Sequence, residues 1–303
     1  MEKIILDVDT GQDDAVALTL VSGYLDKLDV LGIVASHGNQ IVNKVVINTL
    51  NMCQSLNIDA PVYRGSFRPL LRKQVIAGAI HGETGLDGPI FDKLKKKSEK
   101  KRGIDFLIET VNANPGEVTL VFTCPLTDLA LALRLDHDFE KNVKRVVLMG
   151  GSSGQGNITP SSEFNIFADP ESASIVFSSR MKIIVMSLDV TLNLILKPKI
   201  LDNFRNIDTL KAKNFCLGMD FYTQSCKEYI HDYPAMHDPC CVAYLIEPNI
   251  FSFKRVDVKI ETESKYCYGR TVVGFENQES NIFWATAVDE QRFWCILEKA
   301  LRS

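Results

Sequence analysis

Four aspartates lie within eight residues near the start of the chain, in the segment Asp7-Val8-Asp9-Thr10-Gly11-Gln12-Asp13-Asp14. Two carboxylates about 4 Å apart repel each other by roughly 4 kcal/mol at an effective dielectric constant of about 20. A fold that gathers several carboxylates needs protons or a cation to hold them together, and oxygen-only ligands favour Ca²⁺ or Mg²⁺ over softer metals. The segment therefore predicts a site for a hard metal ion. In the alternative interpretation, Asp7 is a turn residue or only supports the site, and Asp13 is a helix N-cap.

An apolar run precedes these acids, and a helical pattern follows them. The run Lys3-Ile4-Ile5-Leu6 is typical of a buried parallel strand. Thr10-Gly11 ends it, and residues 13–20 predict a helix with acids in its first turn, where the helix dipole favours them. In open α/β sheets, ligands bind just beyond the carboxyl ends of the strands. We therefore expect the acids at that edge of a sheet.

Short apolar runs alternate with helical patterns through the first two thirds of the chain. Further buried strands are predicted at residues 30–35, 118–122, 146–149 and 183–186. Helices are expected at about 43–56 and 126–135. This alternation predicts an α/β fold with an open, mostly parallel twisted sheet and helices on both faces.

The last third of the chain has a different pattern. Helices are predicted at residues 209–229 and 290–301. Residues 256–261 and 271–273 alternate in the way that suits a small antiparallel edge. No internal repeat and no linker divides the chain, so we expect residues 1–303 to form a single domain.

Size and composition limit the class of protein. With 303 residues, of which 46% are hydrophobic and 24% charged, the chain can bury a large core as ordinary globular proteins do. A net charge of −4 gives no electrostatic reason to bind nucleic acid or an anionic membrane. No apolar stretch approaches the ~18 residues of a membrane span, the N-terminus lacks a signal-peptide pattern, and the eight cysteines form no C-x-x-C pair. These features predict a reduced cytoplasmic protein.

One segment is strongly basic, residues 93–102, with the sequence Lys-Leu-Lys-Lys-Lys-Ser-Glu-Lys-Lys-Arg. It contains no aromatic residue on which bases could stack, and it belongs to an acidic protein. We interpret it as a solvated loop and the start of a helix, and not as a patch that binds nucleic acid.

Further polar residues follow the predicted strands and are therefore expected at the same edge of the sheet. The candidates are Asn39, His81 in a glycine-rich loop, Thr123 with a free main-chain carbonyl, Met149 before two glycines, Asn157, Glu163, Asn165 and the pair His237-Asp238. Each one alone has an ordinary alternative as a turn residue, a helix cap or a structural imidazole. Asp169 is itself expected to be an N-cap. Their shared location predicts one site at the carboxyl ends of the strands.

Together these segments resemble the calcium-dependent nucleoside hydrolases, the inosine–uridine-preferring N-ribohydrolase family, from Lys3 to the C-terminal helix. The family opens with an apolar strand and the pattern D-x-D-x-G-x-D-D, which is residues 7–14 here. Other family segments occur in the same order: Gly38-Asn39, His81-Gly82-Glu83, Met149-Gly150-Gly151, Glu163-Phe164-Asn165 and His237-Asp238-Pro239. The resemblance implies an enzyme of ribonucleoside catabolism and of purine or pyrimidine salvage, assembled as a homodimer or homotetramer. Its reaction would split the N-glycosidic bond of a ribonucleoside into ribose and free nucleobase.

The resemblance also implies a metal centre. Asp9, Asp14, Asp238 and the main-chain carbonyl of Thr123 would bind Ca²⁺. Asp9 would also take a proton from the water bound to that ion, and Asn39 would help to orient this water. Asn39 and Asp238 would contact the substrate as well.

The sugar would be held by a second set of residues. Asp13 and Asn165 would hold the 2′- and 3′-hydroxyls, Asn157 and Glu163 the 5′-hydroxyl, and Met149 would pack beside the ribose. Cleavage of the bond passes through an oxocarbenium-like sugar, which neighbouring carboxylates stabilise. His81 and His237 would face the departing base, with His237 as the candidate proton donor, worth about 10²- to 10⁴-fold in rate.

Two segments depart from the family pattern. Cys124-Pro125-Leu126-Thr127-Asp128 stands where many relatives carry Gly and then Asn, but a main-chain ligand from Thr123 tolerates any side chain. The segment 220–234 corresponds to a wall over the base that is mobile and variable in length in the family. Four of its side chains could reach the base: Tyr222, Tyr229, His231 and Tyr233. The preference for purine or pyrimidine stays open.

Two rival interpretations use the same acids. Asp7-Val8-Asp9-Thr10 resembles the D-x-D-x-T loop of haloacid-dehalogenase-type phosphatases, but no G-D-x-x-x-D loop follows, and Asn165 and His237 would be unused. A calcium-stabilised nucleoside-binding protein would need neither a base such as Asp9 nor a proton donor such as His237. We therefore favour the hydrolase.

Overall fold

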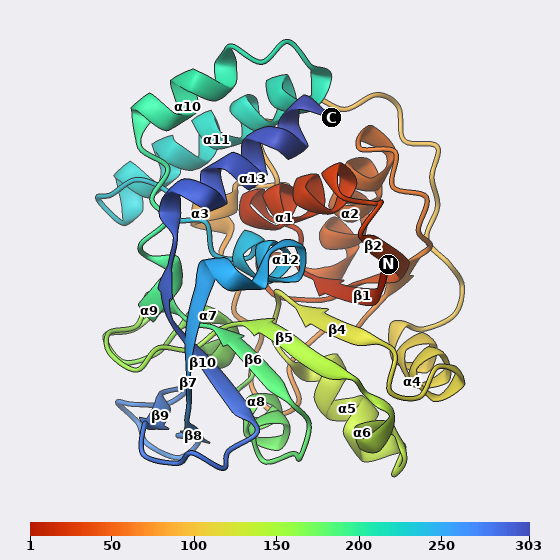
Figure 1. Ribbon diagram of the computed structural model, residues 1–303, viewed down its shortest axis with the longest axis vertical. Coiled ribbons are helices and arrows are strands. Elements are labelled where there is room, and N and C mark those ends of the chain that lie inside the picture. Colours follow the sequence, from red (N-terminus) through yellow and green to blue (C-terminus); the bar gives the residue numbers. More distant parts are fainter.

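The computed structural model describes residues 1–303, and an eight-stranded sheet runs through its centre (Figure 1). The strand order is β3-β2-β1-β4-β5-β6-β10-β7. Neighbouring strands are parallel except for the antiparallel pair of β10 and β7 at one edge. The strands are β1 (Glu2–Val8), β2 (Leu28–Ala35), β3 (Val62–Arg64), β4 (Thr119–Phe122), β5 (Arg145–Met149), β6 (Ile183–Met186), β7 (Phe251–Arg255) and β10 (Ile282–Val288). The predicted open, mostly parallel sheet with an antiparallel edge is confirmed.

A separate antiparallel pair, β8 (Asp257–Ile260) and β9 (Thr271–Gly274), lies near the ends of β7 and β10 (Figure 1). The sequence predicted this pair and five strands of the main sheet. It missed β3, β7 and β10. β3 has only three residues, β7 carries three polar residues among five, and β10 joins the sheet beside β6 from far along the chain.

Helices cover both faces of the sheet (Figure 1). One face carries α1 (Gln12–Gly23), α2 (Val42–Ser55), α10 (Pro198–Arg205), α11 (Leu210–Tyr229), α12 (Pro239–Ile246) and α13 (Glu290–Arg302). The other face carries α4 (Gly103–Ala113), α5 (Thr127–Leu135), α6 (Phe139–Asn142) and α8 (Pro170–Phe177). Three short helices lie in connecting segments, α3 (Gly78–His81), α7 (Phe164–Ala168) and α9 (Leu188–Thr191), and η1 (Pro248–Ile250) precedes β7. None of these helices has both the length and the apolar character needed to cross a membrane.

The sheet separates two apolar cores, of 57 and 28 buried residues. Side chains of a strand point alternately to its two faces, and β1 obeys this rule. Ile4, Leu6 and Val8 belong to the larger core, whereas Ile5 belongs to the smaller core, on the side of α4, α5 and α8. Asp7 therefore points to the same side as Ile5.

The basic segment 93–102 lies outside helices and strands, and most of its side chains are exposed. α4 begins directly after it at Gly103. The expectation of a solvated loop before a helix is confirmed. All eight cysteines are free thiols, as expected.

Candidate active site

The turn between β1 and α1 brings the predicted acids into one buried cluster. β1 ends at Val8, and Asp13 and Asp14 lie in the first turn of α1. Asp238 comes from the far end of the chain, at the N-cap of α12. One carboxylate oxygen from each of Asp13, Asp14 and Asp238 lies within 4.8 Å of the others. The fold thus joins the N-terminal acids to a distant aspartate, as the sequence predicted.

Asp9 lies beside this cluster, and Asn39 holds its carboxylate. The backbone N–H of Asn39 donates to Oδ2 of Asp9 at 2.8 Å, and the side-chain Nδ2 donates to Oδ1 at 3.1 Å. Gly38 makes the approach possible, because a Cβ there would lie 1.8 Å from Oδ2 of Asp9. Asn39 therefore holds both carboxylate oxygens of Asp9 in place.

Burial and mutual repulsion raise the pKa values of these acids. Burial, and then the charge of Asp13, raises the pKa of Asp14 to about 7, although the Thr123 hydroxyl donates to Asp14 at 2.6 Å. Burial followed by the charge of Asp14 raises the pKa of Asp9 well above its usual range. Burial followed by the charge of Asp13 does the same for Asp238. An all-oxygen set of crowded, buried acids fits a hard divalent cation, whose charge favours their ionised forms.

A cavity of about 120 Å³ opens beside the acids. Every residue that the sequence predicted for the site lines this cavity, except Asp14: Asp9, Asp13, Asn39, His81, Thr123, Met149, Asn157, Glu163, Asn165, His237 and Asp238. Asp14 belongs to the acidic cluster at the cavity wall. The fold therefore brings the complete predicted set together at the carboxyl ends of the strands.

Glu163 and Asn165 form a rigid part of the wall. Glu163 is the N-cap of α7, and its carboxylate accepts hydrogen bonds from the backbone N–H groups of Gly151 and Asn165, each at 2.9 Å. Burial raises the pKa of Glu163, and these N–H donors oppose that rise. The side chain of Asn165 donates to the carbonyl oxygens of Thr123 at 3.1 Å and Met149 at 3.2 Å. These bonds fix two polar side chains against the same cavity.

Aromatic and imidazole rings form the opposite part of the wall. The rings of His81 and Tyr222 stack with centroids 5.6 Å apart and an interplanar angle of 28°. Nδ1 of His237 lies 2.8 Å from the hydroxyl oxygen of Thr191. Burial lowers the pKa of both histidines. Among the four aromatic candidates of segment 220–234, Tyr222 lines the cavity, whereas the side chains of Tyr229 and His231 are exposed.

The two residues that depart from the family pattern lie behind the site. Oδ2 of Asp128 accepts the Ser36 hydroxyl at 2.7 Å, and Asp128 also accepts the backbone N–H of Ser66 at 3.0 Å. The Ser36 hydroxyl is also 2.5 Å from Oδ1 of Asp7, to which the Cys124 thiol donates at 3.3 Å. None of these residues lines the cavity. Asp7 therefore supports the site from outside, as the alternative interpretation held.

Asp169 is an N-cap, as expected, because its carboxylate accepts the backbone N–H of Ser172 at the start of α8. Nothing in the sequence pointed to Thr191 beside His237 or to Ser36 between Asp7 and Asp128. A hydroxyl residue has too many ordinary positions to be recognised without its neighbours.

Comparison with known proteins agrees with this site. The family described as inosine-uridine preferring nucleoside hydrolase matches residues 4–295. Similar curated proteins include the pyrimidine-specific ribonucleoside hydrolase RihB of Shigella flexneri serotype 5b, 38% identical over 305 residues, or 99% of this chain and 97% of the relative. RihB of Escherichia coli O9:H4 is 38% identical over 307 residues with the same coverage.

Solved structures give the same result. A plant nucleoside hydrolase, PpNRh1, superposes with a TM-score of 0.93 at 29% identity, covering 100% of this chain and 99% of the plant chain. A purine-preferring ribonucleoside hydrolase from Gardnerella vaginalis superposes with a TM-score of 0.93 at 27% identity, covering 99% and 98%. These matches favour the hydrolase over the phosphatase. The chain belongs to the inosine–uridine-preferring nucleoside hydrolase family and is a ribonucleoside hydrolase.

Proposed function

We propose that the protein splits ribonucleosides into ribose and free base at the acidic cluster, with Ca²⁺ held by Asp9, Asp14, Asp238 and the carbonyl of Thr123. The observation that supports this most is the set of crowded, buried carboxylates at the wall of a cavity whose other polar groups suit a sugar and a base. When bound, Ca²⁺ would supply Lewis-acid polarisation of a water molecule and an anchor for ribose hydroxyls.

Asp9 would be the base that takes a proton from the attacking water. Its two oxygens are fixed by the two N–H donors of Asn39. The charge of the bound ion would keep Asp9 ionised and therefore able to accept a proton. Asn39 would therefore orient the water through Asp9.

The sugar would lie along the rigid wall. Asp13 and Asn165 would hold the 2′- and 3′-hydroxyls, and Asn157 and Glu163 the 5′-hydroxyl, with Met149 packed beside the ring. Fixed contacts at several hydroxyls align the anomeric carbon with the attacking water. The neighbouring carboxylates would stabilise the positive charge that develops at this carbon.

His237 would donate the proton to the departing base. One ring nitrogen of His237 is engaged by Thr191, which leaves the other nitrogen for the substrate. The variant His237→Ala should lose about 10²-fold in kcat/KM with uridine and much less with p-nitrophenyl riboside, whose leaving group needs no proton. Equal losses on both substrates would contradict this role.

One panel assay tests the proposal as a whole. Release of free base would be measured for uridine, cytidine, inosine, adenosine and guanosine, before and after removal of metal by a chelator, and after Ca²⁺ is restored. The pyrimidine nucleosides uridine and cytidine are tested first because the RihB relatives are named pyrimidine-specific. The purine nucleosides are included because the Gardnerella protein is named purine-preferring. We expect turnover that disappears with the chelator and returns with Ca²⁺. Full activity without metal would reject the metal centre, and no base release from any nucleoside would reject the function.

Three further properties stay predictions. The homodimer or homotetramer can be checked by light scattering, the cytoplasmic location by cell fractionation, and the role in nucleoside salvage by growth on nucleosides as the source of bases.

A further inference from the structure

The amide of Gln12 makes three hydrogen bonds around His81, and two of them are fully buried. Gln12 occupies the last unspecified position of the pattern D-x-D-x-G-x-D-D, begins α1 and is 0% exposed. Its Nε2 lies 3.3 Å from the carbonyl oxygen of His81 and 3.0 Å from that of Asp87. Its Oε1 lies 2.6 Å from the ring nitrogen Nδ1 of His81.

These contacts leave only one orientation for the amide. Carbonyl oxygens accept hydrogen bonds and never donate them, so the NH₂ group of Gln12 must face the two carbonyls. The flipped amide would place Oε1 of Gln12 against both carbonyl oxygens, where acceptors repel each other and neither of these two bonds can form. Oε1 therefore faces Nδ1 of His81. Since Oε1 can only accept, Nδ1 must carry the proton.

The ring of His81 has little freedom to escape this arrangement. A Cβ on Gly11 would lie 2.6 Å from Nδ1 of His81, so the backbone of the acidic turn packs directly against the ring. Tyr222 stacks on the ring face at 5.6 Å. Burial lowers the pKa of His81, which keeps the ring neutral near neutral pH. A neutral imidazole that is protonated at Nδ1 carries a lone pair on Nε2.

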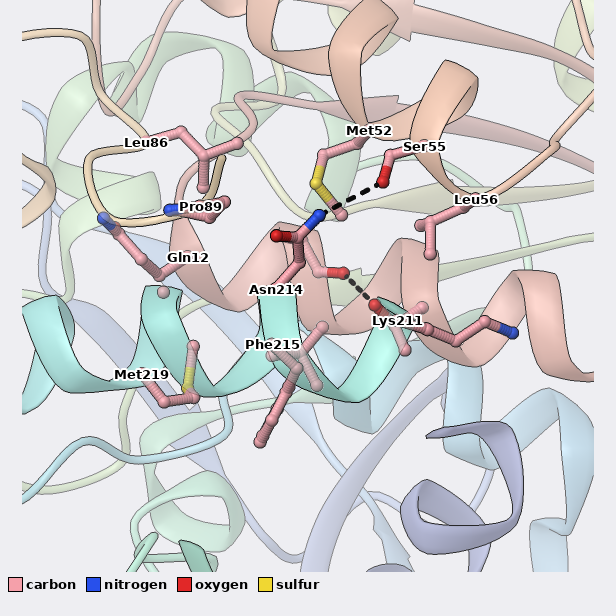
Figure 2. Close-up of a pocket in the computed structure, with 14 residues that line it drawn as sticks. Gln12, Met52, Ser55, Leu56, Leu86, Pro89, Lys211, Asn214, Phe215 and Met219 are labelled. Carbon is pink, nitrogen blue, oxygen red and sulfur yellow. Dashed lines mark hydrogen bonds between the residues drawn. The ribbon is translucent and has the colours of Figure 1, made fainter. Parts of the chain in front are cut away.

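The Gln12 side chain is also shielded from the substrate side. Gln12 does not line the cavity that contains His81 and His237. It lies instead at the margin of a second, mainly apolar cavity of about 20 Å³, beside Leu86 and Pro89 and near Met219 of α11 (Figure 2). The substrate therefore meets the imidazole of His81 and not the amide behind it.

We infer that Gln12 is a positioning residue that holds His81 in its Nδ1–H tautomer, so that His81 offers the nucleobase a hydrogen-bond acceptor and no proton. This inference rests on the proposed function for its substrate. It assigns different tasks to the two histidines of the cavity: His81 would recognise an N–H group on the edge of the base, and His237 alone would be free to donate. A base whose N–H is replaced by N–CH₃ at that edge should be a poorer substrate.

The tautomer can be measured without any substrate. The chain has five histidines, so ¹⁵N-histidine labelling gives a small set of ring signals, and the His81→Asn variant identifies those of His81. At about pH 8, where a neutral ring is favoured, we expect Nδ1 of His81 to be pyrrole-like and Nε2 pyridine-like. In Gln12→Met, where Nδ1 loses its acceptor, the signals should shift toward a mixture of tautomers. In Gln12→Glu, which keeps an acceptor oxygen, the Nδ1–H form should persist.

Gln40 provides a matched control. It is also a buried amide, and its Nε2 donates to the carbonyls of Gly82 at 3.4 Å and Glu83 at 3.2 Å in the same loop, with no bond to the His81 ring. Gln40→Met should loosen the loop yet leave the His81 tautomer unchanged. An Nε2–H tautomer in the wild-type protein would overturn the inference. So would an unchanged tautomer in Gln12→Met, or the same shift in Gln40→Met.

Substrate pairs test the consequence for recognition. Wild-type kcat/KM should be about tenfold higher for uridine than for 3-methyluridine, the size expected for one lost hydrogen bond to a buried acceptor. In Gln12→Met this ratio should fall toward one. If purines are the substrates, inosine and 1-methylinosine form the matching pair. A ratio that Gln12→Met leaves unchanged reflects the size of the methyl group alone and would reject the acceptor role. If no nucleoside is hydrolysed, the proposed function fails, while the tautomer result stands separately.

Discussion

Two groups of buried aspartates lie at the end of β1, and their charges are balanced in different ways. In the supporting group, Asp128 and Asp169 face hydrogen-bond donors of the chain itself, and Asp7 meets Asp128 across the shared Ser36 hydroxyl. Asp169, for example, accepts the Thr127 hydroxyl at 2.6 Å and the backbone N–H of Leu70 at 3.0 Å. In the site group, oxygens of Asp13, Asp14 and Asp238 lie within 4.8 Å of one another, and the charge of Asp14 raises the pKa of Asp9. Buried acids with their own donors stabilise the fold, whereas acids that face each other need a proton or a cation.

The contrast is sharpest between Asp7 and Asp9, which only one residue separates. Asp7 is still within β1, so the alternation of the strand directs it toward α5 and Asp128. Burial, followed by the charge of Asp128, raises the pKa of Asp7 well above its usual range, which favours its neutral form. Asp9 lies just past the strand, at the cavity. Of these two acids in one motif, Asp7 thus supports the fold behind the site, whereas Asp9 lies at the cavity.

The largest expected effect comes from replacing each of these acids with its amide. Asp9→Asn should lower kcat by about 10³-fold, because an amide cannot take the proton from water. Asp7→Asn should stay within a few-fold of wild type, since an amide replaces a carboxyl that is already neutral. Both would be measured as base release at saturating nucleoside and Ca²⁺, with circular dichroism to check the fold. Comparable losses in the two variants would remove the distinction between the groups.

This pair also shows how far the sequence alone could lead. The acidic motif and its strand predicted a metal site, because their place after an apolar run fixes the edge of the sheet on which the acids lie. Only the family resemblance singled out Asp9 and Asp14 as ligands. The task of Asp7 could not be decided, since its partners Ser36 and Asp128 follow other strands and nothing local connects them. The same limit hid the bond between Gln12 and His81, because two residues distant in sequence meet only when the fold is known.

For the strands too, local sequence patterns could be predicted, whereas features that depend on distant residues could not. The predicted strands of the main sheet are continuous apolar runs, because a strand buried on both faces needs apolar residues at nearly every position. They are β1, β2, β4, β5 and β6. β3 and β7 lie at the two edges of the sheet, where half-exposed residues weaken that pattern. The choice between Tyr222 and Tyr229 needed the direction of α11, which decides which of its side chains face the cavity, and the other two candidates lie beyond the end of this helix.

The next effect concerns stability in the supporting group. Asp128→Ala should lower the free energy of unfolding by about 3 kcal/mol, because the N–H of Ser66 and the hydroxyl of Ser36 lose a buried acceptor. Its kcat should change less than about threefold, since Asp128 does not line the cavity. Urea denaturation would measure the first quantity and base release the second.

Asp138→Ala is the matched control. Asp138 is an exposed acid paired with Lys141 at 2.7 Å, so its loss should leave the free energy of unfolding nearly unchanged. A large loss of activity in Asp128→Ala with unchanged stability would show that the supporting group takes part in the reaction.

The smallest expected effect is the pH dependence of metal binding in the site group. The pKa of Asp14 in the folded protein, about 7, lies above its ordinary value of 3.8, so the metal-free folded protein binds more protons than the unfolded chain between these values. Its contribution to stability therefore falls as the pH rises through this range. Ca²⁺ needs the ionised form and must displace the proton, so the apparent Kd should rise by at least about tenfold for each pH unit below pH ~7. Metal-free protein would be titrated with Ca²⁺ while its melting temperature is measured. The ion should raise the melting temperature more at pH ~8 than at pH ~6. The same stabilisation at both pH values would mean that Asp14 already carries its charge without the ion, and the crowded site group would then differ little from the supporting group.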